Sequence, residues 1–478
     1  MQKIAFIAII DALLYILLHN INMIEIEKAT TEKSTTEEPI DIKPKKPSKI
    51  QTLRGFQDLL PDFQDYYTMI KKAVRHRGRQ SGFKRITTPI MEETAVFSRS
   101  LGESSDVVSK EMFTMTSRSG KLMTLKPEAT AGIVRAYIEH GMHTLPQPVQ
   151  LYSIEPQFRY DRPQKGRFRQ FHQVDFEVLG MKDPSIDAQM IHMAYKILED
   201  LQISDRVDIQ INSLGSAENR EEYMEALRDF FFDKKQHLSE DSQARLEINP
   251  LRILDSKDED DQILVSMAPK LKDFLSPESK AFYETVKDYL RELNIPFYEN
   301  EGLVRGLDYY CDTVFEIWDK SQGAQNAIGG GGRYDGLAEL LGGVPTPGVG
   351  FAMGVERIVG HMKDSGIKPA SKDNVQFFVA QLGEEGKKKA LKITTNLRDL
   401  GFHALGGMGK SSMKAQLKMA DKSGARWAII LGEIEVRENK AILRDMKLGK
   451  QEIIPLENIE QTVIERLGEK PDIYTLGD

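Results

Sequence analysis

The sequence is poor in cysteine, since Cys311 is the only one among 478 residues. Internal disulfides are therefore excluded, as is a zinc site built from several cysteines, and a reducing compartment is expected. An excess of positive charge is also lacking, because 65 lysines and arginines face 72 aspartates and glutamates, for a net charge of -7. A general positive field for coating nucleic acid is thus excluded, and any polyanion must be bound by local cationic patches.

A hydrophobic run long enough to cross a membrane is lacking too. Residues 4–18 (IAFIAIIDALLYILL) are apolar but include Asp11, and they fall short of the roughly 20 residues that a spanning helix needs. They also lack a clear small-residue cleavage site, so a dispensable extension, with Met23 as the true start, is preferred over a divergent signal peptide. Residues 28–50 hold Thr, Glu, Lys and Pro with almost no large apolar side chains, which predicts a linker. We expect folding to begin near Leu53.

Beyond the linker, the chain mixes helical and extended patterns and is long enough for about three domains. Residues 61–80 repeat apolar side chains at helical spacing, and residues 83–90 then turn extended and end at Thr88-Pro89. Residues 149–159 and 167–179 are two further extended runs. The loop residues between them, which include a proline and a glycine, predict a long-looped antiparallel hairpin.

The stretch FRYDRPQKGRFRQFHQ (158–173) crowds cationic side chains into this hairpin. Alternate residues of its second strand fall on opposite faces, of which one is apolar and the other carries Phe171, Gln173, Asp175 and Glu177. A solvent-exposed polar face is the simpler interpretation. Guanidinium groups beside a flat apolar ring favour a nucleotide site instead, with arginine for phosphate and Phe171 for adenine.

Three later segments complete the pattern. Residues 303–317 (LVRGLDYYCDTVFEI) are strand-like, and residues 328–337 (IGGGGRYDGL) are rich in glycine. Glycines permit a backbone to approach a ligand closely, although tight turns collect them as well. Residues 347–358 run from a short apolar strand into a helix with Glu356-Arg357 near the junction. A Walker lysine motif and a correctly placed dinucleotide fingerprint are both absent.

The order of these segments resembles motifs 1, 2 and 3 of the class II aminoacyl-tRNA synthetases. Over about residues 50 to 470 the chain is similar to the histidyl-tRNA synthetase family, on LVRGLDYY (303–310), GGRYDGL (331–337), GESSDVVSKEMF (102–113), LKPEATAG (125–132) and the stretch 158–173. The resemblance implies an α/β (α+β) fold. Its parts would be a class II catalytic domain with an antiparallel sheet flanked by helices, a helical insertion, and a C-terminal α/β anticodon-binding domain.

The resemblance also divides the chain. Residues 50–215 would be the first part of the catalytic core with motifs 1 and 2, and residues 301–370 the second part with the histidine motifs and motif 3. Residues 216–300, which are rich in helical spacing and acidic stretches, would be the insertion, thought of in the family as a clamp on the acceptor arm. Residues 375–478 would be the anticodon-binding domain, after the extension and linker of residues 1–49.

The implied activity is that of a histidine–tRNA ligase, which activates L-histidine with ATP to histidyl-adenylate and transfers it to tRNA(His), releasing AMP and pyrophosphate. Attack of a carboxylate on the α-phosphorus builds negative charge, so cations must be in place beforehand. By resemblance Arg159 and Arg305 act catalytically at the α-phosphate, and the ATP site comprises Arg159, Arg167, Phe171 and Arg357. Magnesium is expected with ATP, and zinc is not.

The resemblance assigns the histidine pocket as well. Glu128, Thr130 and Gln173 would bind the ammonium group, and Glu177 and Tyr310 the imidazole, with Tyr309 and Tyr334 nearby. A site that pairs both ring nitrogens rejects isosteres, because its own buried polar groups would be left unsatisfied. The chain departs from the family at three positions without losing a group that the chemistry requires: Lys126 for arginine, Ala129 for glycine and Asp161 for glutamate.

The C-terminal part repeats strand and helix patterns and carries a lysine stripe, formed at every fourth residue by Lys410, Lys414, Lys418 and Lys422. A solvated lysine face and an RNA contact both fit this stripe, and the resemblance to an anticodon-binding domain favours RNA. The family further implies a homodimer through motif 1 around residues 80–90, a cytoplasmic location and no membrane attachment.

Two competing functions remain. A catalytically silent relative serves as the histidine-sensing regulatory subunit of ATP phosphoribosyltransferase, but such relatives lack the C-terminal domain and tend to lose the arginines, both of which this chain keeps. An RNA-binding module without activation chemistry is the more distant rival. Histidine-dependent ATP–pyrophosphate exchange would separate it from the enzyme.

Overall fold

The computed structural model describes residues 49–102, 105–164, 166–254, 256–320, 327–369, 375–407, 409 and 412–467. Residues 1–48, on which the expected extension and most of the linker fall, therefore lie outside the described residues. Along the described ranges, no helix combines the length and the apolar composition needed to cross a membrane.

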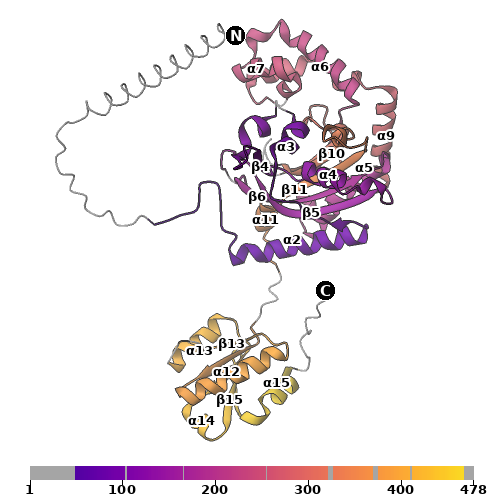
Figure 1. The fold of residues 1–478 in the computed structure, drawn as a ribbon. Coiled ribbons are helices and arrows are strands. Elements are labelled where there is room, and N and C mark those ends of the chain that lie inside the picture. Colours follow the sequence, from indigo (N-terminus) through magenta and orange to yellow (C-terminus); the bar gives the residue numbers. More distant parts are fainter. Residues whose placement is uncertain are drawn as a thin grey trace, which may run out of the picture. The chain divides into compact units, whose positions relative to one another are not determined.

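An eight-stranded sheet is the centre of residues 54–369 (Figure 1). Its strand order is β1 (Lys84–Arg85), β5 (Val149–Phe158), β6 (Gln170–Leu179), β11 (Gly348–Gly354), β10 (Ala327–Arg333), β9 (Cys311–Asp319), β7 (Val207–Ser213) and β8 (Tyr298–Glu299). The six inner strands pair antiparallel, and only the two short edge strands of this sheet, β1 and β8, pair parallel. The expected antiparallel sheet is confirmed.

One face of this sheet is covered by helices. The apolar side chains of α2 (Pro61–Gln80), α5 (Pro184–Asp200), α9 (Pro277–Glu292) and α11 (Val355–Asp364) form one core with the inward residues of the strands. Phe176 of β6 is buried in this core and stacks between the rings of Tyr152 and Phe351, with centroids 5.4 and 5.2 Å away. The core fixes which side of β6 faces the helices, and so leaves the alternate residues for the other side.

The predicted hairpin is confirmed. Strands β5 and β6 pair over ten positions, from Val149 opposite Leu179 to Phe158 opposite Gln170. The apolar residues of β6 lie in the core and Phe171 and Gln173 on the opposite face, as the alternation of the sequence predicts.

The strand predicted across residues 303–317 is wrong in its first half, because β9 begins only at Cys311. Residues 303–310 form an irregular loop whose backbone carbonyls bond to side chains rather than to a neighbouring strand: those of Leu303, Gly306 and Asp308 accept from Asn212, Arg252 and Arg220. The glycine-rich segment, in contrast, is strand β10 in the sheet rather than a tight turn.

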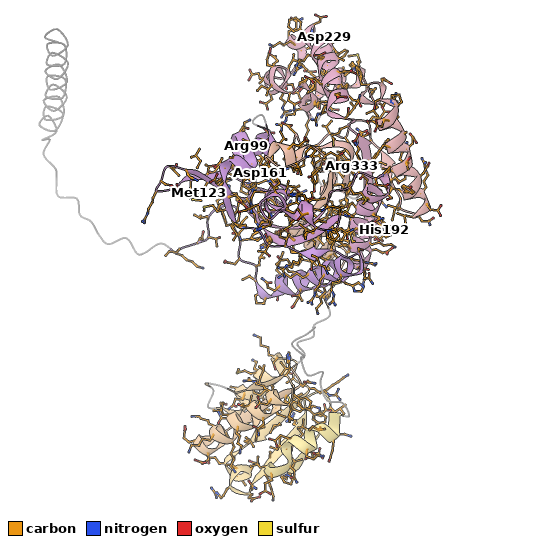
Figure 2. The ribbon with its side chains drawn as sticks, turned by 45° about the vertical axis from the view of Figure 1, so that its right-hand side comes forward. Arg99, Met123, Asp161, His192, Asp229 and Arg333 are labelled. Atoms are coloured by element: carbon orange, nitrogen blue, oxygen red, sulfur yellow. The ribbon has the colours of Figure 1, made fainter. Side chains whose placement is uncertain are left out.

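The described residues between β7 and β8 include four α-helices: α6 (Ala217–Phe232), α7 (Glu240–Ile248), α8 (Glu259–Met267) and α9. Each begins at a short polar side chain that accepts a bond from the first turn, contributed in order by Ser216, Ser239, Asp258 and Ser276. Such caps satisfy backbone donors that a helix start leaves open. In Figure 2, Asp229 marks the outer part of α6.

On the other face of the central sheet, α3 (Thr94–Leu101), α4 (Thr130–Glu139) and α10 (Leu337–Leu340) share a second core with α6, α7 and α8. A small antiparallel sheet, in the order β2 (Met91–Glu93), β4 (Leu122–Leu125) and β3 (Phe113–Thr116), follows Thr88-Pro89. The space between the second core and the central sheet holds the candidate site.

The C-terminal part has its own five-stranded sheet, in the order β13 (Ala404–Gly406), β12 (Phe377–Gln381), β14 (Trp427–Leu431), β15 (Lys440–Asp445) and β16 (Gln451–Pro455). Its helices are α12 (Gly383–Asp399), α13 (Met413–Lys422), α14 (Glu433–Arg437) and α15 (Ile459–Leu467). Ala420 of α13 is buried, whereas three lysines of the predicted stripe are exposed on this helix: Lys414, Lys418 and Lys422. Lys410 lies outside the described residues.

Candidate active site

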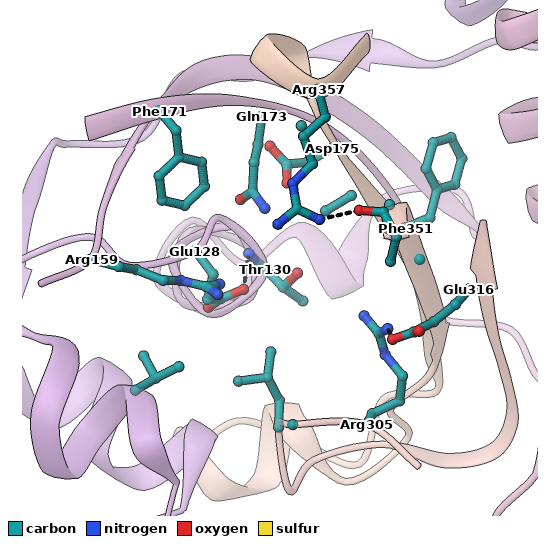
Figure 3. A pocket seen from close by; sticks show the side chains of 18 of the residues that line it. Glu128, Thr130, Arg159, Phe171, Gln173, Asp175, Arg305, Glu316, Phe351 and Arg357 are labelled. Carbon is teal, nitrogen blue, oxygen red and sulfur yellow. Dashed lines mark hydrogen bonds and ion pairs between the residues drawn. The ribbon is translucent and has the colours of Figure 1, made fainter. Parts of the chain in front are cut away.

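A cavity of about 380 Å³ opens on the polar face of the central sheet (Figure 3). Its walls contain almost all of the predicted catalytic, ATP-binding and histidine-binding residues: Glu128, Thr130, Arg159, Arg167, Phe171, Gln173, Arg305, Tyr309, Tyr310, Tyr334 and Arg357. These residues are up to 229 positions apart in the chain (128 to 357), so the fold has brought one chemical set together. Glu177 is the exception, because it lies behind the wall.

The floor of the cavity is bare backbone from two glycine-bearing strands. A Cβ atom on Gly350 of β11 would lie 1.6 Å from Oε2 of Glu177, and one on Gly330 of β10 would lie 2.8 Å from Nη1 of Arg305. Any larger residue at either position would therefore displace a site side chain. The glycines therefore permit close packing of site side chains against the backbone of the sheet.

Glu177 holds two hydroxyl groups of the wall. Its Oε1 accepts from Oγ1 of Thr130 at 2.7 Å, its Oε2 accepts from the Tyr334 hydroxyl, and its side chain is 1% exposed. Burial raises the pKa of the Glu177 carboxyl well above its ordinary value, against the lowering effect of the two hydroxyl bonds. The geometry therefore joins Thr130 and Tyr334, which sequence reasoning had assigned to opposite ends of the substrate.

Glu128 is fixed at the start of α4. Its carboxylate oxygens accept from the backbone N–H groups of Thr130 and Ala131, at 2.7 and 2.8 Å, although the side chain also lines the cavity. Burial raises the pKa of Glu128 even so. A buried carboxylate held in this way presents a pre-oriented negative edge to a cationic ligand.

Three arginines concentrate positive charge on another side of the cavity. Arg159 donates from Nε to the Pro127 carbonyl at 2.8 Å and lies 5.6 Å from the centre of the Phe171 ring, while Arg167 pairs with Asp161 at 3.0 Å. Burial lowers the pKa of Arg357, and the charges of Arg167 and Arg159 lower it further. Such mutual repulsion is relieved by an anion, which fits the phosphates of a nucleotide.

Arg305 has a partner that sequence reasoning missed. Its Nη1 donates to Oε1 of Glu316, whose Oε2 accepts from Trp318 at 2.7 Å. Burial opposes the charge of Arg305, but Glu316 and then Tyr310 raise its pKa above the ordinary value. The alternation of β9 places Glu316 on the same face of the strand as Val314. This alternation was the sequence signal that could have indicated on which face Glu316 lies.

Sequence reasoning also gave no role to two buried polar residues, Asp175 and Gln157. Asp175 lines the cavity, was placed on the polar face from the sequence, and was given no role. Among the described residues its Oδ1 has no hydrogen-bond partner, nor has Oε1 of Gln173 or either polar side-chain atom of Gln157. Leaving buried polar atoms unsatisfied costs about 1–3 kcal/mol each, so water or ligand donors are expected here. Of these side chains, Gln173 and Asp175 line the cavity, so their unsatisfied oxygens are the ones that a ligand could meet.

Replacing Asp175 by asparagine should stabilise the unliganded protein by an amount that grows with pH. Burial raises the pKa of this carboxyl to about 8 in the folded protein, against the lowering effect of Ser153. An unfolded aspartate titrates at about 4. Between these values only the folded state holds the proton, so the wild-type protein loses up to about 1.4 kcal/mol of unfolding free energy per pH unit as pH rises.

Because the asparagine variant does not titrate there, its advantage in melting temperature should widen from about pH 5 to about pH 8 and then level off. The difference in melting temperature between the two proteins removes the contribution of titrating groups far from Asp175, because both proteins share them. A difference in melting temperature that does not change with pH would show that Asp175 is charged in the folded protein over this whole range.

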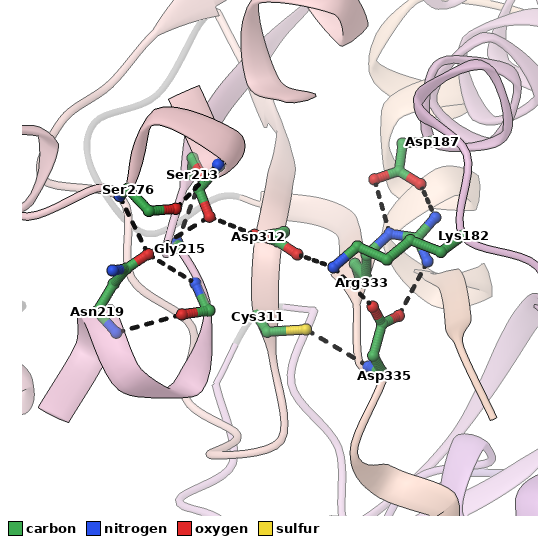
Figure 4. Close-up of polar contacts among 12 residues, drawn as sticks. Lys182, Asp187, Ser213, Gly215, Asn219, Ser276, Cys311, Asp312, Arg333 and Asp335 are labelled. Carbon is green, nitrogen blue, oxygen red and sulfur yellow. Dashed lines mark hydrogen bonds and ion pairs between the residues drawn. The ribbon is translucent and has the colours of Figure 1, made fainter. Parts of the chain in front are cut away.

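The described residues contain one cluster with metal-ligand types, formed by Cys311, Asp312 and Asp335. The Lys182 ammonium group already pairs with both carboxylates, at 3.0 and 3.3 Å (Figure 4). Burial raises the pKa of the Cys311 thiol to about 12, which disfavours the thiolate that would bind a metal. This cluster fits an internal ion pair better than a metal site.

Comparison with known proteins gives the family. The model of the histidyl-tRNA synthetases matches residues 55–358, and that of an anticodon-binding domain matches residues 376–466. A histidine–tRNA ligase of Dehalococcoides mccartyi is 44% identical over 409 residues, which cover 86% of this chain and 98% of that protein. One of Natranaerobius thermophilus is 40% identical over 416 residues, which cover 87% and 99%.

Solved structures agree. The apo histidyl-tRNA synthetase of S. aureus is similar with a TM-score of 0.73 at 35% identity, covering 87% of this chain and 100% of that chain. An ATP phosphoribosyltransferase regulatory subunit/histidyl-tRNA synthetase of Bacillus halodurans has a TM-score of 0.58 at 19% identity, covering 81% and 99%, and shares the fold alone. With a family model matched over 304 residues (55 to 358) and relatives at least 40% identical along almost their whole length, the chain belongs to the histidyl-tRNA synthetase family.

Proposed function

We propose that the protein is a histidine–tRNA ligase, which activates L-histidine with ATP and transfers the histidyl group to tRNA(His). The observation that carries the proposal is the single cavity in which three arginines and an aromatic ring adjoin a buried, acceptor-rich pocket. The first set suits the phosphates and base of ATP, and the second suits an amino acid with a cationic ammonium group.

In the first step a histidine carboxylate oxygen attacks the α-phosphorus, and the bond to the bridging oxygen of pyrophosphate breaks. Arg159 and Arg305 would stabilise the charge that develops at the α-phosphate, and Arg167 and Arg357 would hold the outer phosphates while Phe171 stacks on adenine. The arginines are oriented before substrate binds, by Pro127, Glu316 and Ala327 among others, so little reorganisation is needed during the reaction. In the second step a ribose hydroxyl of tRNA attacks the carbonyl carbon, and AMP leaves.

For histidine itself, Glu128 and Gln173 would accept from the ammonium group, with the Thr130 hydroxyl beside them. Tyr309, Tyr310 and Tyr334 would surround the imidazole. Because Glu177 lies behind the wall and accepts from Thr130 and Tyr334, it would fix the orientation of these hydroxyl groups even before it meets the ring.

Magnesium bound with ATP would neutralise phosphate charge and stabilise the leaving pyrophosphate. Glu111 and Asp161 line the cavity, and carboxylate oxygens are the hard ligands that magnesium prefers, so these two acidic residues would hold the ion. The proposal needs no zinc.

Histidine-dependent exchange of labelled pyrophosphate into ATP tests the proposed function. The purified protein should catalyse exchange with L-histidine and not with other amino acids, and should charge tRNA(His) when it is supplied. Histidine binding without exchange would favour the histidine-sensing regulatory subunit, and RNA binding without either would favour a plain RNA-binding module.

The proposed enzyme is a cytoplasmic homodimer. Large apolar side chains are exposed on and beside the small sheet that follows Thr88-Pro89, namely Ile90, Met91, Met115 and Leu122, with exposures of 49, 37, 41 and 54%. Surfaces of this kind mark protein contacts. A monomer that is fully active at nanomolar concentration would contradict the dimer.

Replacing Lys414, Lys418 and Lys422 together by alanine should weaken tRNA binding by about tenfold or more and flatten its salt dependence, because each phosphate contact adds to the salt slope. Adenylate formation should be unchanged. Filter binding across a salt series measures the effect. The matched control replaces three lysines of α12, Lys387, Lys388 and Lys392, and should bind tRNA normally. An equal loss of tRNA affinity in both triple variants would show that the lysines of α13 are only solvated and do not contact RNA.

A further inference from the structure

The loop of residues 303–310 carries five residues of the cavity wall, among them the three with predicted roles, Arg305, Tyr309 and Tyr310. None of its described residues pairs with a neighbouring strand, so the sheet does not fix the backbone of the loop. The side chains that do so come largely from the inserted segment between β7 and β8, none of whose described residues lines the cavity.

Arg220, in the first turn of α6, makes the central contact. Its Nη1 donates both to the Asp308 carbonyl at 3.1 Å and to the Tyr310 carbonyl. One guanidinium nitrogen thus bridges the two carbonyls on either side of Tyr309. Hydrogen bonds from a charged donor are about twice as strong as neutral ones, so this contact restricts the backbone that presents both tyrosine rings.

Two further side chains of the insertion hold the same loop. Asn249 donates to Oδ1 of Asp308 at 3.3 Å, and Arg252 donates to the Gly306 carbonyl at 3.2 Å. Arg252 also lies 3.6 Å from Asp106, another residue of the cavity wall. Side chains of the insertion therefore hold the loop at Gly306, Asp308 and Tyr310.

The base of the insertion is tied to the end of the loop (Figure 4). Asp312, which follows Tyr310 by two residues, has a left-handed backbone with φ of 44° and accepts from Ser279 of α9 at 3.2 Å. Its N–H donates to the Gly215 carbonyl at 2.8 Å, immediately before α6. Asn219 of α6 accepts from the backbone of Ser276, which caps α9. The starts of α6 and α9 thus lie at the point where the loop enters β9.

We propose that Arg220 is a positioning residue of the histidine pocket, supplied by the helical insertion: it fixes the backbone of residues 308–310 and thereby sets the affinity for the amino-acid substrate. This inference rests on the proposed function. It assigns to the insertion a part in substrate recognition that is separate from any contact with RNA.

Arg220→Gln tests it, because glutamine cannot bridge both carbonyls with a charged donor. In the exchange assay its KM for histidine should rise by about tenfold or more, while its KM for ATP changes by less than about twofold. Arg220→Lys keeps the charge and should recover part of the loss. Arg228→Gln, on the exposed side of the same helix, is the matched control and should behave as wild type.

The outcomes are distinguishable. Absence of exchange in the wild-type protein would overturn the proposed function itself. If the wild type is active, an Arg220→Gln protein with a lower melting temperature but an unchanged KM for histidine, or with equal rises in both KM values, would overturn the positioning role. Should Arg220→Gln fail to fold, Asn249→Ala and Arg252→Gln decide: an unchanged KM for histidine in both would overturn the inference, and a selective rise would support it.

Discussion

Arg305→Ala should lower the rate of adenylate formation by about 10² to 10³, while ATP and histidine affinities change little. A group that stabilises charge only as the carboxylate attacks acts on turnover and not on ground-state binding. Transfer of histidine from preformed adenylate to tRNA should suffer less, because the α-phosphate is then part of an activated leaving group.

The structure sharpens the control for this experiment. In the structure Arg305 pairs with Glu316, so a purely structural Arg305 would act through this ion pair. Removing the arginine leaves Glu316 with the Trp318 donor, so some loss of stability is expected in addition. Glu316→Gln keeps the guanidinium and should retain most of the activation rate. Single-turnover measurement of both half-reactions, with melting followed in parallel, decides; a stable Arg305→Ala protein slowed equally in both steps would refute the catalytic role.

Arg333→Met should lower the unfolding free energy of the catalytic body, residues 54–369, by about 3–5 kcal/mol. Arg333 of the GGRYDGL motif lies inside that body, with its side chain and that of Asp187 both 0% exposed (Figure 2). Its Nε donates to Oδ2 of Asp187 on α5 at 3.2 Å, and its Nη1 donates to Asp335 at 2.9 Å. Truncating it would leave Asp187 as a buried and unpaired charge, which is far more costly than losing the pair as a whole.

Chemical denaturation followed through Trp318, in a Trp427→Phe background, reports the catalytic body selectively. The double variant Arg333→Met, Asp187→Leu should regain part of the loss, because no buried charge then remains. Arg77→Met is the matched control: it breaks a pair with Asp200 at the other end of α5 that is 26 and 27% exposed, and should cost no more than about 1 kcal/mol. Similar losses of unfolding free energy in Arg333→Met and Arg77→Met would mean that burial does not determine how much stability is lost when an ion pair is broken.

Much of the site was accessible from local pattern. The alternation of residues 170–179 separated the core face of β6 from the face that carries Phe171 and Gln173, because side chains of a strand point in turn to opposite sides. The apolar spacing of residues 61–80 gave α2 with the same first and last residues that the helix has in the structure. The assignment of roles to individual arginines and tyrosines came from the resemblance to a family and not from these patterns, and those roles stay predictions.

The sequence by itself therefore determined the hairpin, the faces of its strands, the cationic stretch and the family. Only the tertiary structure decided that Glu316 holds Arg305, that Glu177 lies behind Thr130 and Tyr334, and that residues 303–310 form a loop. Arg220 and Tyr310 are 90 residues apart, and Arg333 and Asp187 are 146 apart. Periodicity reports which way a side chain points within its own element, whereas a partner across such distances is chosen by how whole elements pack.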